Sequence, residues 1–285
     1  MNRNHTAFFA FLLFGIVLTG CGKIQDQTTV AKARPSDDAP PGSWPSSAAS
    51  TENPEPSETD RLAGELVAVL EKAYAASSSE QLLAFFQKWH DSYEPCNLAT
   101  ITDPVEKEVY RVYRAFYDPF DLSRLGGSEL PRDFYQGFRY VIVQDSLTYE
   151  TEPNGQKHKI TEFRPPLEFE NVDVLYLTPA YSEALTRFLG SKHLPMATGN
   201  LMAPARAKGE SRKRLEFLGQ YVKILHGHWS GWHLCTHPAV GGIRLDADRT
   251  RASVGYRVRY KGGSADLQKK QGRWKIEEAR ITWIE

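Results

Sequence analysis

The chain has 285 residues, and its 35 basic residues balance its 35 acidic residues, so the formal net charge is zero. This balance gives no electrostatic reason to expect contact with nucleic acid, and we expect no nucleic-acid partner.

The first 20 residues have the layout of a signal peptide. Arg3 supplies positive charge, and residues 7–18 (AFFAFLLFGIVL) are apolar throughout. This apolar run is shorter than the roughly 20 residues that a membrane-spanning helix needs. We therefore predict that residues 1–20 are an export signal that is removed.

The segment Leu18–Cys21 (LTGC) resembles the lipobox of bacterial lipoproteins, in which small residues precede an invariant cysteine. The resemblance implies cleavage before Cys21 and acylation of its sulfur, with palmitate among the attached chains. Two or three acyl chains make such an anchor effectively permanent, since each buried CH₂ contributes about 0.8 kcal/mol. Gly22 follows where some inner-membrane lipoproteins have Asp, which favours the outer membrane, facing the periplasm. The alternative is an ordinary secretory signal with a cysteine at its cleavage site.

Residues 21–57 are rich in Pro, Ser, Ala, Thr and Asp, with Trp44 as the one aromatic residue. Such a composition cannot bury enough apolar surface to offset its ordering entropy. We expect a disordered tether that the prolines keep extended.

Three helices are predicted at the start of a mixed region, 58–200. The first follows the cap candidates Ser57, Thr59 and Asp60, and the third begins at Asp103-Pro104. Apolar residues recur at helical spacing in all three: Leu62, Leu66, Val69, Leu70 and Ala73; Leu82, Leu83, Phe86 and Trp89; Val105, Val109, Val112 and Phe116.

Short strands are predicted at Tyr140–Val143, Leu147–Tyr149 and Val172–Leu177. A fourth helix is expected to begin at Thr178-Pro179 and to stop at Gly190. The final region, 201–285, should open with a helix marked by Leu215, Leu218, Val222 and Leu225.

The C-terminal residues predict an antiparallel meander of about four strands. Apolar and polar residues alternate from Ala252 to Tyr260, and Ile243–Leu245 precedes them. Turns are predicted at Gly262-Gly263 and Gln271-Gly272, with the last strand beginning at Trp274. The fold class is therefore α+β, with N-terminal helices and a C-terminal curved antiparallel sheet.

This end of the chain, with Gly272-Arg273-Trp274-Lys275-Ile276, resembles the nuclear-transport-factor-2-like (NTF2-like, cystatin-like or SnoaL-like) superfamily. The resemblance covers the last 45 to 80 residues. It implies a conical cavity between the sheet and its helices, which that superfamily uses for several chemistries and for binding. The chain departs from the superfamily in placing one helix directly before these strands and the others far upstream.

A histidine-rich stretch runs from His226 to Pro238 and contains His228, His233, His237 and Cys235. Imidazole and thiolate are good ligands for zinc or copper, so the four histidines are candidate metal ligands. The spacings match no compact ligand motif, however, and no carboxylate lies within the stretch. The alternatives are a structural turn with aromatic packing, or a ligand-binding rim that includes Trp229 and Trp232.

Two other groups of residues are candidates. Arg257 and Arg259 are predicted to share a strand face with Arg251, which could bind an anionic ligand or be a solvated face. Cys96 and Cys235 could form a disulfide in an oxidising compartment, or remain two buried thiols.

The chain contains no Gly-x-Ser-x-Gly, Walker or His-Glu-x-x-His motif. We assign no catalytic residue and expect no cofactor. The sequence favours a membrane-tethered envelope lipoprotein that binds or scaffolds a protein or small molecule of unspecified identity. The alternative is an envelope enzyme that uses the conical cavity or the histidines.

Overall fold

The computed structural model describes residues 55–126, 130, 132–153, 155–190, 209–227 and 231–284. These residues belong to one compact unit, which begins at Pro54. The predicted signal peptide, Cys21 and the tether up to residue 54 lie outside the described residues. Within the described ranges, no helix is both long enough and apolar enough to cross a bilayer.

The predicted helices are confirmed, and local capping explains where three of them begin. Ser57, Ser78 and Asp103 each accept a hydrogen bond from a backbone N–H of the first turn that follows. A short 3₁₀ helix at Leu122–Leu125 follows the third α-helix. The α-helices are α1 (Glu58–Ala75), α2 (Ser79–Asp91), α3 (Pro104–Phe116), α4 (Pro179–Leu189) and α5 (Gly209–Leu218).

The last helix is shorter than its apolar spacing predicts. Helix α5 ends at Leu218, and the chain then turns, with the Val222 N–H donating to the Leu218 carbonyl oxygen. Leu225 lies instead in a short strand. Val222 is nevertheless buried, so its position in the apolar pattern reflects packing and not helix.

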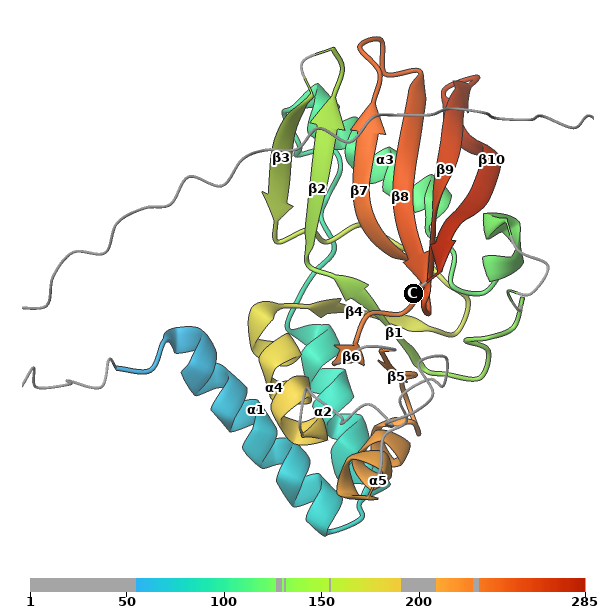
Figure 1. Ribbon diagram of the computed structural model, residues 1–285. Coiled ribbons are helices and arrows are strands. Elements are labelled where there is room, and N and C mark those ends of the chain that lie inside the picture. The colour runs from blue at the N-terminus through green and yellow to red at the C-terminus, as the bar shows by residue number, and fades with distance from the viewer. Residues whose placement is uncertain are drawn as a thin grey trace, which may run out of the picture. The chain divides into compact units, whose positions relative to one another are not determined.

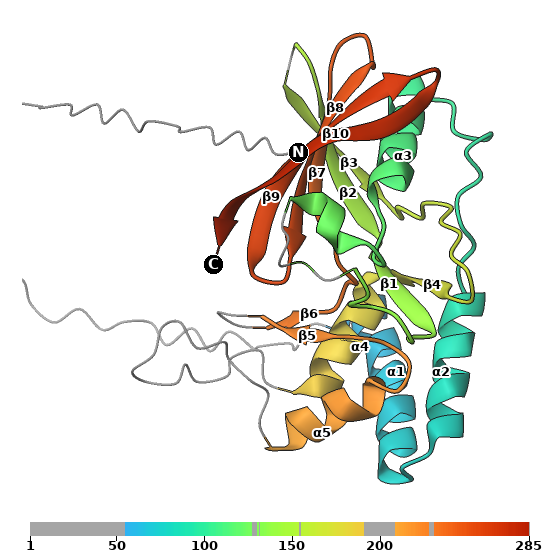
Figure 2. The same ribbon diagram turned by 90° about the vertical axis from the view of Figure 1, so that its right-hand side faces the viewer.

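Six strands form the main sheet, in the order β3-β2-β7-β8-β9-β10 (Figure 1). All neighbours are antiparallel except β2 and β7, which are parallel. Figure 2 shows α3 lying along one face of this twisted sheet. The strands are β2 (Ser146–Thr151), β3 (Gln156–Thr161), β7 (Ala239–Leu245), β8 (Arg251–Val258), β9 (Lys261–Lys270) and β10 (Arg273–Ile284).

Two small sheets lie apart from the main one. Strand β1 (Tyr140–Gln144) pairs in parallel with β4 (Asp173–Leu177). Strand β5 (Leu225–His226) pairs with β6 (Trp232–His233). Figure 1 shows β1 and β4 between the six-stranded sheet and helices α1, α2, α4 and α5.

The alternation predicted for the C-terminal meander is confirmed, but one predicted turn is wrong. Val258 pairs with Lys261, so the turn consists of Arg259 and Tyr260, and both glycines lie within β9. The glycines serve a close approach of β10 instead. A Cβ atom on Gly262 would lie 2.0 Å from the Trp283 ring, and one on Gly263 would lie 2.1 Å from the Arg280 carbonyl oxygen.

Two hydrophobic cores share strand β1. Tyr140 and Ile142 belong to the core formed with α1, α2, α4 and α5, whereas Val141 and Val143 belong to the core between α3 and the main sheet. Successive side chains of a strand point to opposite faces, so one strand can serve both cores. All four residues are at most 1% exposed.

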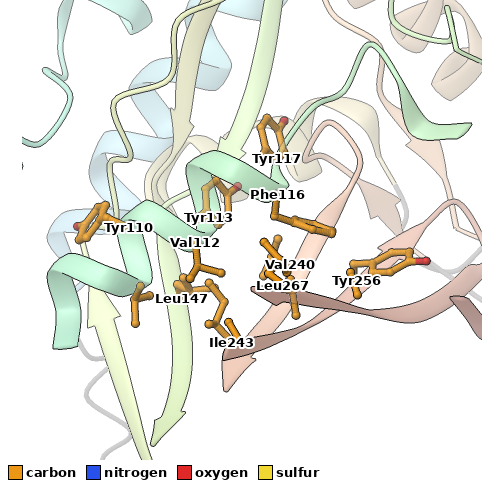
Figure 3. Close-up of a cluster of buried hydrophobic side chains, with 14 of the residues drawn as sticks. Tyr110, Val112, Tyr113, Phe116, Tyr117, Leu147, Val240, Ile243, Tyr256 and Leu267 are labelled. Atoms are coloured by element: carbon orange, nitrogen blue, oxygen red, sulfur yellow. The ribbon is translucent and has the colours of Figure 1, made fainter. Parts of the chain in front are cut away.

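The space between α3 and the sheet, where the superfamily resemblance implies a cavity, is filled by side chains. Figure 3 shows Val112 and Phe116 extending from α3 toward Leu147, Ile243 and Leu267 of the sheet, and all five are buried.

The boundary predicted at residue 200 does not separate two folding units. Strand β2 from the first region pairs with β7 from the second, and α5 packs against α4 in the helical core. The α+β class is confirmed in a single unit.

Candidate functional site

The histidine-rich stretch connects the helical core to the main sheet. His226 lies in β5, Trp232 and His233 form β6, and His237 precedes β7 by one residue. His228 and Trp229 lie outside the described residues. The Trp232 ring is half-buried and meets the edge of the His226 ring at a centroid distance of 5.0 Å.

His233 is held by Arg257. The Arg257 Nη2 atom lies 2.7 Å from His233 Nε2, and a guanidinium can only donate, so Nε2 accepts and the proton resides on Nδ1. Burial, reinforced by the nearby Arg257 charge, lowers the pKa of His233 to about 4. The imidazole is therefore neutral at pH 7.

His237 is clamped by Tyr135 and by the β8–β9 turn. The backbone N–H of His237 donates to the Tyr135 hydroxyl oxygen at 3.0 Å, and that hydroxyl donates to His237 Nδ1 at 3.1 Å. The backbone N–H of Arg259 also donates to Nδ1, at 3.3 Å. Burial lowers the pKa of His237 to about 3, with further lowering by His233 and Arg257. These contacts fix the segment to the sheet.

This geometry gives little support to the predicted metal site. Across the described ranges, no group of three or more His, Cys, Asp or Glu side chains is placed to hold a metal ion. The predicted pairing of the two arginines on one strand face is wrong for Arg259, because this residue lies in the turn at φ 56°. Arg251 and Arg257 do share a face of β8.

The predicted disulfide is also wrong, since Cys96 and Cys235 are both free. Each thiol lies beside a different tyrosine of α3. Cys96 hydrogen-bonds with Tyr110, and Cys235 interacts electrostatically with Tyr113, nearly one helical turn further on. Burial raises the pKa of the Cys235 thiol to about 12, so it is un-ionised at pH 7.

A different place in the fold has the features of a binding site. A cleft of about 640 Å³ opens where β1 and β4 end, beside the first turns of α1 and α4 and the β2–β3 hairpin. Its size lies within the range usual for small-molecule sites. Ten polar residues line it: Glu58, Thr59, Asp145, Ser146, Lys159, Thr161, Glu162, Arg164, Thr178 and Ser182.

Strand pairing brings two of these residues together. Gln144 and Leu177 are the last partners of the parallel strands β1 and β4, so Asp145 and Thr178 follow at adjacent carboxyl ends. Gln144 fixes this end of β1 through side-chain hydrogen bonds with the backbone of Val240, at 3.0 Å in both directions. The carboxyl ends of parallel strands are a recurrent place for ligands.

Asp145 and Arg164 form a strained electrostatic pair in the cleft. The Asp145 backbone oxygen accepts from Phe163 N–H at 2.8 Å, which brings the next residue, Arg164, beside the carboxylate. Arg164 Nε lies 3.7 Å from Asp145 Oδ1, which is too long for a hydrogen bond. Burial raises the pKa of Asp145 and outweighs the lowering by Arg164, while Glu162 adds to the rise.

Thr178 differs from the other capping residues. It precedes α4, yet its hydroxyl makes no capping hydrogen bond. The residue is 7% exposed, and its Oγ1 atom is buried without a hydrogen-bond partner among the described residues. Asp145 Oδ1 and Arg164 Nε share this condition, so three such atoms line one cleft.

Two further clefts, of about 400 and 320 Å³, lie on the face of the sheet opposite α3. Their charged groups are largely paired with one another, as in the 3.0 Å contact between Arg244 and Glu150. In the part of the chain that the structure describes, no buried unpartnered side-chain atom lines either cleft. The cleft at the ends of β1 and β4 is therefore the stronger candidate.

Sequence reasoning missed this cleft, although two local signals pointed toward it. Asp145 is a single acidic residue between two predicted strands, and Thr178-Pro179 joins a predicted strand to a predicted helix. Neither signal reveals that β1 and β4 are neighbours.

Comparisons of the chain with protein-family models, with curated proteins and with solved structures give no match. The fold and the site thus define the chain by its own features, as an α+β unit with a polar cleft at the carboxyl ends of two parallel strands.

Proposed function

We propose that this protein is a lipid-anchored binding module of the bacterial cell envelope, in which the cleft at the ends of β1 and β4 binds a small polar molecule. The observation that carries the binding proposal is the set of three buried, unpartnered polar atoms that line this cleft. A buried polar group without a partner costs about 1–3 kcal/mol, so a ligand that satisfies these atoms would bind favourably.

Binding is favoured over the enzymatic alternative because the histidines proposed for catalysis are engaged elsewhere. His233 Nε2 and His237 Nδ1 both accept hydrogen bonds within the protein. Neither residue lines the cleft.

The anchoring part of the proposal rests on the sequence of residues 1–57. Cys21 would carry the lipid, the Pro/Ser-rich segment would hold the folded unit away from the membrane, and the outer membrane facing the periplasm would be the site of attachment. An NTF2-like ancestry for α3 and the six-stranded sheet is proposed on the C-terminal meander packed against a single long helix.

Anchoring is tested by expressing the full chain in a Gram-negative host with labelled palmitate. We expect a labelled, globomycin-sensitive product in the membrane fraction, and its loss in Cys21→Ala. Cys96→Ala is the matched control and should keep the label. Unchanged processing and membrane association in Cys21→Ala would contradict lipidation.

Binding is tested by calorimetry of the full chain against a broad panel of small polar metabolites, including neutral, anionic and cationic compounds. We expect at least one compound to bind, and Asp145→Ala to abolish its binding. Asp266→Ala, on the opposite face of the sheet, should leave binding unchanged. If no compound binds in a manner that depends on Asp145, the cleft is not a small-molecule site.

A further inference from the structure

The unpartnered atoms of the cleft also restrict the chemistry of its ligand, and this inference rests on the proposed binding function. The Asp145 side chain is 10% exposed, and Thr178 is 7% exposed. Both are nine-tenths buried, yet each directs an unpartnered oxygen into the cleft. Native proteins pair most buried polar atoms, so this concentration points to a partner from outside the chain.

The Asp145–Arg164 pair requires a group that can both donate and accept. Asp145 Oδ1 accepts, whereas Arg164 Nε–H donates, and 3.7 Å separates them. A hydroxyl can donate to the carboxylate oxygen while it accepts from the guanidinium. A ligand carboxylate cannot donate to Oδ1 and would be repelled, and an ammonium cannot accept from Nε–H.

The guanidinium is held in place for this role. Its Cζ atom lies 4.7 Å from the centroid of the Tyr93 ring, and its Nη2 atom lies 3.8 Å from Glu162 Oε2. Stacking and ion pairing restrict the plane of the guanidinium, so Nε keeps its direction toward the cleft.

The remaining lining also matches hydroxyl groups. Thr178 Oγ1 both donates and accepts, and four further hydroxyl side chains line the cleft: Thr59, Ser146, Thr161 and Ser182. The charged side chains of the lining carry both signs, so they favour neither a strongly anionic nor a strongly cationic ligand.

We infer that the cleft binds a neutral, polyhydroxylated ligand of the monosaccharide class, with one ligand hydroxyl bridging Asp145 and Arg164 and another meeting Thr178.

The test compares sugars that differ only in charge. The full chain is titrated with glucose, galactose, mannose and N-acetylglucosamine, and with glucuronate and glucosamine as charged counterparts, by saturation-transfer NMR and calorimetry. We expect at least one neutral sugar to bind, and a carboxylate or ammonium group on the same ring to weaken binding by about tenfold or more.

Variants locate the site. Thr178→Val replaces the hydroxyl by a methyl group of similar shape and should weaken sugar binding about tenfold. Its thermal unfolding midpoint serves to confirm that it folds. Asp145→Ala should abolish binding, and Asp266→Ala should not affect it.

Two results would overturn the inference. If no neutral sugar binds, or if sugar binding persists in both Thr178→Val and Asp145→Ala, the ligand class or its location is wrong. If only charged compounds bind, and Asp145→Ala abolishes that binding, the cleft remains a binding site and only the inferred ligand class fails.

Discussion

Glu108 illustrates how single polar residues are accommodated inside the core between α3 and the sheet. This residue of α3 is 6% exposed, and it accepts hydrogen bonds from Trp274 Nε1 and Lys269 Nζ, each at 2.9 Å. Arg111 also contacts its carboxylate. Burial would raise the pKa of Glu108, but these partners outweigh burial and hold the pKa below its usual value.

Replacing this carboxylate should destabilise the fold. Glu108→Gln leaves the charge of Lys269 largely buried without a counter-charge, so we expect the free energy of unfolding at pH 7 to fall by about 3 kcal/mol. Because the folded-state pKa lies below the unfolded-state value, the contribution is full above about pH 4.3 and disappears as the pH falls through the folded-state pKa. Urea unfolding between pH 3 and 7 measures this.

The matched control is Glu278→Gln on the outer face of β10. The Glu278 side chain is 64% exposed, and its contact with Arg280 is 3.5 Å long, so its loss should change stability by less than about 1 kcal/mol. Equal effects of the two substitutions at pH 7 would refute the role assigned to the buried network.

At the scale of elements, local signals were sufficient for helices and insufficient for part of the sheet. The caps at Ser57 and Asp103 depend on residues within one turn, so sequence could predict them. Strand β3 was missed because only Ile160 of its six residues is buried. The turn at Gly262-Gly263 was misplaced because the reason for these glycines lies on another strand, β10.

The second glycine of this pair should tolerate no side chain. In Gly263→Ala the new methyl group would meet the backbone of β10 and the Tyr256 ring, so we expect a loss of about 1–3 kcal/mol in the free energy of unfolding. Gly255→Ala is the matched control, because its Cβ would have no neighbour closer than 3.9 Å. Chemical denaturation of both variants measures the difference, and a Gly263→Ala protein as stable as Gly255→Ala would show that β10 adjusts freely.

At the scale of the whole unit, the candidate site depends on contacts that no local pattern encodes. Asp145, Arg164 and Thr178 are separated by 19 and 14 residues, from the differences 164 − 145 and 178 − 164, and the pairing of β1 with β4 brings two of them together. The sequence predicted both strands but offered no way to pair them. The same strand β1 also joins the two cores, so the site lies where the cores meet.

This shared strand predicts that the two cores unfold together. Ile142 is fully buried in the helical core, and Ile142→Ala should lower the free energy of unfolding by about 2–5 kcal/mol. If the cores form one cooperative unit, amides of α2 and of β8 should lose the same amount of protection against hydrogen exchange. Val69→Ala, at a position that is 47% exposed, is the control and should change protection by less than about 0.5 kcal/mol. Reduced protection in α2 with no change in β8 would instead show that the helical core opens independently of the sheet.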